Sequence, residues 1–85
     1  MNNYVEYAKA IVSGLCLKPD EVEVAKAMDE LGVLLTVKVS PEDVGRLIGR
    51  QGRTAEAIRL LVRLAGYNDG ARVSLKIRDP ETVEN

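Results

Sequence analysis

The chain has 85 residues, a formal net charge of −1 and 46% hydrophobic residues, which is the composition of an ordinary globular protein. A chain of this size buries only about 60–65% of the surface that it exposes when unfolded, so its core is thin and leaves little room for a deep catalytic cleft. It has no histidine and a single cysteine, which excludes an internal disulfide and, in practice, a metal site of cysteine and histidine ligands.

The first half of the chain predicts a helix followed by two strands. Apolar side chains in residues 3–17 recur with the 3.6-residue period of a helix, and Cys16 is interpreted as a small buried hydrophobe on it. Residues 21–28 alternate at first, which favours a strand, although the second half of this segment could also be helical. Turn residues follow at 29–32. The alternation in residues 33–39 predicts a second strand, and a leucine on its other face suggests a central position in the sheet.

A helix start is expected at residues 40–43. Ser40 can cap the helix, and Pro41 suits its first position. The acidic residues Glu42 and Asp43 suit the positive end of the helix dipole. The pattern predicts that this helix ends at about residue 47 or 48.

A second helix and a last strand complete the predicted elements. The helix is expected at 53–65, with Gly66 as its C-terminal cap and a loop at 67–70. The strand is expected at 71–78, and the acidic tail that follows is expected to be frayed. The apolar face of the helix consists of Ala55, Ile58, Leu61, Val62 and Ala65.

The resulting order, α-β-β-α-α-β, predicts an α+β fold with a three-stranded mixed sheet and helices packed on one face. The first two strands form a hairpin, and the chain returns through two helices to a strand parallel to the second one. We expect one domain over residues 1–85, with its core at about 4–78 and a tail at 79–85. No apolar run reaches the ~20 residues of a membrane span, and a cytoplasmic protein is expected.

Basic residues gather around a glycine-rich corner between the two later helices. Residues 44–63 contain a single acidic residue, whereas the arginines of this block are Arg46, Arg50, Arg53, Arg59 and Arg63. Gly49 and Gly52 leave bare main chain that a sugar-phosphate strand could approach, and the helix start after Gly52 favours an anion. Arginine makes forked contacts with phosphate oxygens. The corner therefore predicts a phosphodiester ligand.

The glycine-rich corner is open to other interpretations. It could be a simple helix–helix corner with no ligand. The spacing fits neither a P-loop, G-x-x-x-x-G-K-[ST], nor a dinucleotide fingerprint, G-x-G-x-x-G. A helix-turn-helix DNA reader stays open, although only arginines line the outer face. An enzyme is not expected, because the sequence offers no histidine and no nucleophile–base pair.

A helix, G-x-x-G, helix pattern is the signature of KH domains, which clamp about four nucleotides. The segments "LIGRQGRTAEAIR" at 47–59, "KPDEVEV" at 18–24 and "VKVSPEDVGRLIGRQGR" at 37–53 resemble the small bacterial single-KH proteins of the KhpA type, also known as the YlqC family. The resemblance spans residues 4–78. It implies the type II KH fold and binding of single-stranded RNA in the cytoplasm.

The resemblance places the RNA in a groove between the G-x-x-G edge and the adjacent strand. The residues expected to contact the RNA backbone are Gly49, Arg50, Gln51 and Gly52, with Arg53 beside them. The apolar positions expected to underlie or line the groove, for which plain core packing is the favoured interpretation, are Val44, Ile48 and Ile58. Two further arginines, Arg46 and Arg59, are counted with the site, although Arg59 and Arg63 could also form a solvated helix face.

The resemblance also implies partners. Members of the family act as RNA chaperones and pair with a larger KH protein of the KhpB (Jag/EloR) type in controlling cell elongation, and a homodimer is an alternative. No cofactor, metal or membrane is expected. A competing hypothesis is a protein-interaction module that docks a partner through the G-x-x-G surface or the first helix. Because the tyrosines, at positions 4, 7 and 67, lie away from the glycines in the sequence, base stacking is expected to contribute little.

Overall fold

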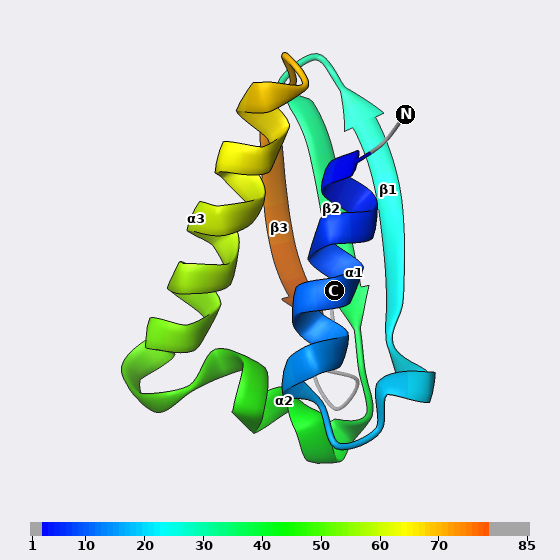
Figure 1. Ribbon diagram of the computed structural model, residues 1–85, viewed down its shortest axis with the longest axis vertical. Coiled ribbons are helices and arrows are strands. Elements are labelled where there is room, and N and C mark those ends of the chain that lie inside the picture. Colours follow the sequence, from blue (N-terminus) through cyan, green and yellow to red (C-terminus); the bar gives the residue numbers. More distant parts are fainter. Residues whose placement is uncertain (1–2, 79–85) are drawn as a thin grey trace.

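The elements of the computed structural model follow the predicted order, with short 3-10 turns between some of them (Figure 1). The structure describes residues 3–78, and the expected tail at 79–85 lies outside the described residues. The elements are α1 (Asn3–Leu15), η1 (Pro19–Glu21), β1 (Glu23–Asp29), β2 (Gly32–Lys38), α2 (Pro41–Ile48), η2 (Arg50–Gly52), α3 (Arg53–Asn68) and β3 (Val73–Arg78). The segment at 21–28 is therefore not helical in its second half; its strand begins after the turn η1.

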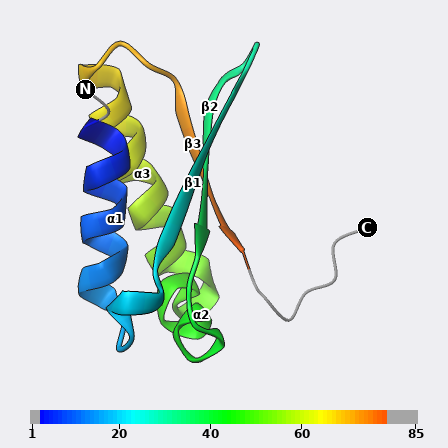
Figure 2. The ribbon, with the colours of Figure 1, turned by 90° about the vertical axis from the view of Figure 1, so that its right-hand side faces the viewer.

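The sheet has the order β1-β2-β3, with β2 in the centre. β1 and β2 form an antiparallel hairpin, and β3 runs parallel to β2. Figure 2 shows α1 and α3 side by side on one face of the sheet, whereas within residues 3–78 no helix covers the other face. The predicted α+β fold is confirmed. α2 crosses the lower end of the sheet, so the corner between α2 and α3 lies at that end of the molecule.

The core forms where the inner side of β2 meets the helices. Val33, Leu35 and Val37 alternate along β2 and are 6%, 0% and 0% exposed. Leu34, between them, points to the other face and is 38% exposed. Fully burying an aliphatic side chain contributes about 1.5–3 kcal/mol, so each of these three buried residues contributes substantially to the stability of the fold. The helical members of the core are Tyr4, Ala8, Val12, Val44, Leu47, Ile58 and Val62.

The end of α3 differs from the prediction. The helix continues to Asn68, so the loop expected at 67–70 begins only at Asp69. Gly66 is not a C-terminal cap but a buried residue inside the last turn. A Cβ atom on Gly66 would lie 2.5 Å from Cγ2 of Val73, so glycine is needed for the close approach of α3 to β3. Gly70, with φ +70°, is the residue that adopts the left-handed conformation after the helix.

Three other local predictions need correction. Ser40 occupies the N-cap position of α2, but its side chain makes no capping hydrogen bond; its carbonyl oxygen accepts the amide of Asp43 at 2.8 Å. Leu61 is 41% exposed, because the stripe of α3 that faces the sheet lies beside it. Cys16 lies one residue past the end of α1 and is partly buried, and this burial raises the pKa of its thiol.

Candidate nucleic-acid interface

The corner between α2 and α3 consists of Gly49 and the single turn η2. Gly49 has φ 74° and ψ 179°, a combination confined almost entirely to glycine. Gly52 has φ 75° and ψ 10°, in the left-handed region. Gln51 is also left-handed, with φ 58°, which costs a non-glycine residue about 1–2 kcal/mol. Strained backbone of this kind is concentrated at ligand-binding sites.

The two glycines of the corner have different roles. A Cβ atom on Gly49 would press against Thr54, at 2.6 Å from its Cβ and 3.0 Å from its backbone nitrogen. A Cβ atom on Gly52 would meet no atom within 4 Å. Gly49 is therefore needed to seat Thr54 and close the corner, whereas Gly52 leaves open space beside its main chain. Of the two, Gly52 is the one that a ligand strand could approach closely.

The start of α3 leaves backbone donors for a ligand. Inside the turn, the amide of Gly52 donates to the carbonyl of Gly49 at 3.3 Å, and the amide of Arg53 donates to the carbonyl of Arg50. No side chain caps the first turn of α3. The next amides of a helix have no acceptor within the helix, and together with the positive end of the dipole they suit an anion.

The polar side chains of the corner lie on its surface. Arg50, Gln51 and Arg53 are all exposed. Ile48, the last residue of α2, is 41% exposed directly before Gly49. The structure thus brings six of the expected site residues, 48–53, into one continuous surface turn, which combines bare main chain with two guanidinium groups.

The other expected site residues are placed differently. Val44 and Ile58 are 7% and 2% exposed, so they pack in the core beneath the corner and cannot line a groove directly. Nε of Arg46 lies 3.8 Å from the carboxylate of Asp43, and its side chain is 52% exposed. Nε of Arg59 donates to a carbonyl oxygen of β3.

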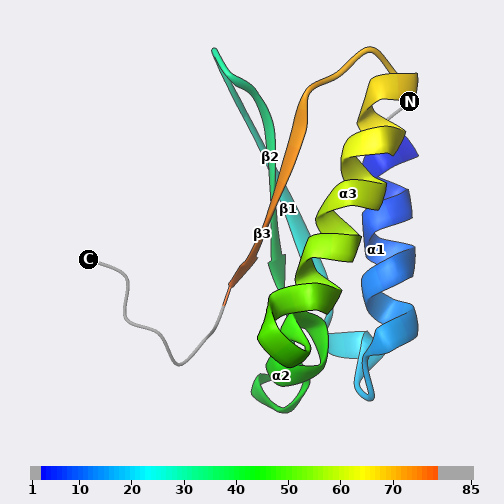
Figure 3. The same ribbon diagram turned by 90° about the vertical axis from the view of Figure 1, so that its left-hand side faces the viewer.

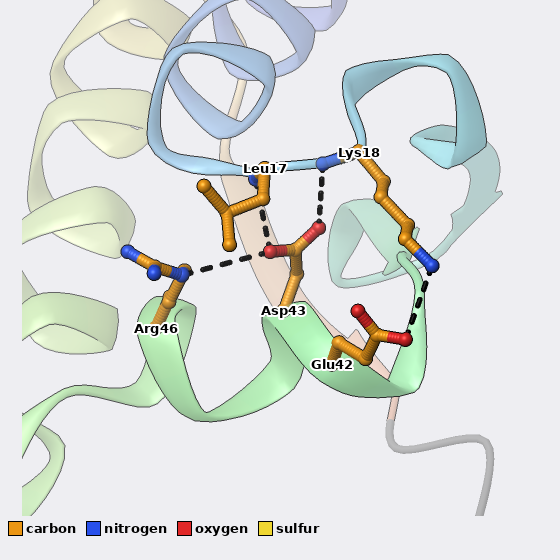
Figure 4. Close-up of polar contacts among 5 residues, drawn as sticks. All are labelled: Leu17, Lys18, Glu42, Asp43 and Arg46. Atoms are coloured by element: carbon orange, nitrogen blue, oxygen red, sulfur yellow. Dashed lines mark hydrogen bonds and ion pairs between the residues drawn. The ribbon is translucent and has the colours of Figure 1, made fainter.

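Asp43 lies in the first turn of α2, as expected, and has a second, structural role that sequence analysis did not reveal. Its side chain is fully buried, and its two carboxylate oxygens accept the amides of Leu17 at 2.9 Å and Lys18 at 3.0 Å (Figure 4). The hydrogen bond from Leu17 is the main reason why the pKa of this carboxyl lies below its ordinary value. Nearby, Glu42 forms an exposed ion pair with Lys18 at 3.1 Å. Asp43 therefore ties the chain after α1 to α2, and its partners are too distant in sequence for a local pattern to reveal them.

A shallow depression of about 440 Å³ lies elsewhere, between α1 and the last turns of α3. It is lined by Tyr7, Leu61, Leu64, Ala65, Asn68 and Asp69. The other tyrosines are also away from the corner: Tyr4 is buried, with the ammonium of Lys26 5.3 Å from its ring centroid, and Tyr67 lies in the last turns of α3. The corner itself therefore carries no aromatic platform for base stacking among the described residues.

Residues 3–78 contain neither a candidate metal site nor a candidate membrane span. No group of three cysteine, aspartate or glutamate side chains lies close enough together to hold a metal ion. No helix in this part of the chain combines the length and the apolar character needed to cross a bilayer.

The chain is similar to a known family over most of its length. The sequence model of the family described as KhpA/KhpB, KH domain, matches residues 5–77. The protein named RNA-binding protein KhpA in Clostridium perfringens is 40% identical over 72 residues, which cover 85% of this chain and 96% of that protein. The protein of the same name in Caldanaerobacter subterraneus is 42% identical over the same shares, and that of Borreliella burgdorferi is 40% identical over 91% and 94%. No solved structure is significantly similar.

Proposed function

The chain belongs to the KhpA/KhpB KH-domain family, and on this premise we propose that it binds single-stranded RNA at the corner between α2 and α3. The relatives are named as RNA-binding proteins and not as enzymes. The observation that carries the proposal is the open space at Gly52, flanked by the exposed Arg50 and Arg53. Phosphate groups of the strand would meet the amides of the first turn of α3 and the two guanidinium groups.

The binding is weak and steered by charge. The corner offers no aromatic ring, so the stacking energy that other single-strand binders gain is missing. Short residence on each strand suits an RNA chaperone, which must release strands so that they can pair again. We therefore extend the proposal to RNA chaperone activity in the cytoplasm.

A charge-reversed corner tests the proposal. In the double variant Arg50→Asp/Gln51→Asp, carboxylates replace the groups that would face the phosphates, and aspartate tolerates the left-handed conformation of position 51. We expect fluorescence anisotropy to show no binding to short single-stranded RNA, while circular dichroism stays native. Lys9→Asp/Ala10→Asp is the matched control, because it changes the net charge by the same amount on the exposed side of α1. Wild-type affinity in the corner variant would refute the site.

A second candidate function is protein interaction, and the outer side of α1 and α3 favours it. Exposed apolar side chains gather there around the depression, and a contiguous apolar surface of this kind is typical of interaction sites. They are Tyr7 (43% exposed), Leu61 (41%) and Leu64 (49%). The partner would be a second copy of the chain or a larger KH protein, since the matched family includes the KhpB type.

The two functions can be separated with the variant Leu64→Glu. If the apolar surface pairs two copies, light scattering after size exclusion should show that the variant has about half the mass of the wild type, while the RNA-binding corner is untouched. A wild-type protein that is monomeric and binds no larger KH protein would remove this candidate. If the wild type binds a protein partner but never RNA, the interaction hypothesis replaces the first one.

A further inference from the structure

Arg59 connects α3 to the edge of the sheet. Its Nε donates a hydrogen bond of 3.1 Å to the carbonyl oxygen of Leu75, across a partly buried contact between α3 and β3. β3 pairs with β2 on one side only, and Figure 3 shows α3 running along this part of the sheet. Within residues 3–78 this is the only polar contact of the Arg59 guanidinium group.

The Leu75 carbonyl, to which Arg59 donates, points to the free edge of β3, on the side opposite β2. In a parallel pair, the backbone groups of successive residues point alternately to the partner strand and away from it. The carbonyl of Arg72 accepts the amide of Val33 in β2, so the groups of Val73, Leu75 and Ile77 point to the free edge. Without Arg59, the Leu75 carbonyl would be an open acceptor, suited to the amino groups of adenine and cytosine.

We propose that Arg59 makes this edge select guanine in a bound single-stranded RNA, an inference that rests on the proposed function above. The bond from Nε holds the guanidinium plane and leaves its two terminal nitrogens for a ligand. Two parallel N–H donors match the O6 and N7 acceptors of guanine. Adenine and cytosine present amino donors in the equivalent place, where they would face the N–H donors of the guanidinium group that Leu75 holds there.

The position of Arg59 is compatible with one strand that contacts both it and the corner. Arg59 follows Arg53 by six residues on α3, which is about 9 Å along the helix axis. A strand held by its backbone at the corner would have to extend over about 9 Å along α3 to reach Arg59. Because Arg59 is already held by Leu75, less side-chain freedom is lost when a base binds.

The test measures the affinity of the full chain for short uridine-rich RNAs that differ at one central base: guanine, adenine or 7-deazaguanine, which lacks the N7 acceptor. We expect the wild type to bind the guanine RNA about tenfold more tightly than the adenine RNA, with 7-deazaguanine close to adenine. Arg59→Lys keeps the charge but loses the fork, and we expect the guanine preference to fall to about twofold or less. Arg63→Lys, one turn further along the exposed side of α3, is the matched control and should keep the preference.

The outcomes separate this inference from the proposed function. If the wild type binds all three RNAs equally and the Arg50→Asp/Gln51→Asp variant binds none, the corner is the site but Arg59 selects no base, and the inference is wrong. If Arg59→Lys loses the same affinity for all three RNAs, Arg59 contacts a phosphate and not a base, and the inference is also wrong. If the wild type binds none of the RNAs, the proposed function fails, and the inference fails with it.

Discussion

The carboxylate of Asp43 and the backbone amide of Leu17 are joined by a hydrogen bond of 2.9 Å between two segments that are 26 residues apart in sequence. The other carboxylate oxygen accepts the amide of Lys18, so backbone donors hold a fully buried negative charge. Asp43 lies in α2, whose last residue leads directly to Gly49. This contact therefore fixes the candidate RNA-binding corner relative to the end of α1.

Removal of this charge should destabilise the fold. In Asp43→Asn, one acceptor is replaced by an amino group that faces a backbone amide, and we expect the melting temperature to fall by about 5–15 °C. Glu42→Gln is the control, because its ion pair with Lys18 is exposed and should change the melting temperature by about 2 °C or less. Thermal unfolding followed by circular dichroism measures both. Equal melting temperatures for the wild type and Asp43→Asn would show that the contact is not stabilising.

The carboxyl group of Asp43 should make the free energy of unfolding depend on pH. The pKa of Asp43 in the folded protein lies below its ordinary value of 3.8, so the carboxylate stabilises the fold above that pH. This contribution is lost as the pH falls through the lower pKa of the folded state. We therefore expect the wild type to have a larger free energy of unfolding than Asp43→Asn at pH 7, and this difference to narrow below about pH 4. Urea unfolding at several pH values between 7 and 2 measures it. A constant difference over the whole range would contradict the assignment.

Replacing either glycine of the corner with alanine should lower the free energy of unfolding, but by different amounts. Gly49→Ala combines an unfavourable backbone conformation with a collision at Thr54, and we expect it to lower the free energy of unfolding by about 2–4 kcal/mol. Gly52→Ala meets no atom and should lower it by only about 1–2 kcal/mol. Its methyl group would nevertheless occupy the space proposed for the RNA strand. We expect anisotropy to show weaker RNA binding by a well-folded Gly52→Ala variant, and undiminished binding would argue against close approach at Gly52.

The affinity for RNA should depend strongly on salt. If about three phosphates are neutralised, the logarithm of the binding constant should fall with a slope of about −2 against the logarithm of salt concentration. A fourfold rise in salt should then weaken binding more than about tenfold. Arg53→Gln removes one contact and should reduce the slope by about 0.7. A slope near zero would mean that phosphate contacts do not drive binding.

Much of the fold could be predicted from the sequence, because the patterns that encode it are local. Val33, Leu35 and Val37 alternate along β2 and are all buried, as expected of a central strand. Pro41 begins α2, and the glycines at 49 and 52 break the chain between two helices, as their left-handed φ angles require. The residues of the candidate corner are also consecutive in sequence, so their proximity needed no tertiary information.

The local patterns are thus sufficient to predict the element order, the inner face of the sheet and a glycine-containing corner among arginines. The roles that depend on distant partners became visible in the folded chain. Asp43 binds amides 25 and 26 residues away, Gly66 is required by Val73, and Arg59 covers the carbonyl of Leu75. The physical reason is that periodicity and turn preferences report the neighbours of a residue along the chain, whereas hydrogen bonds and close packing depend on which segments folding brings together.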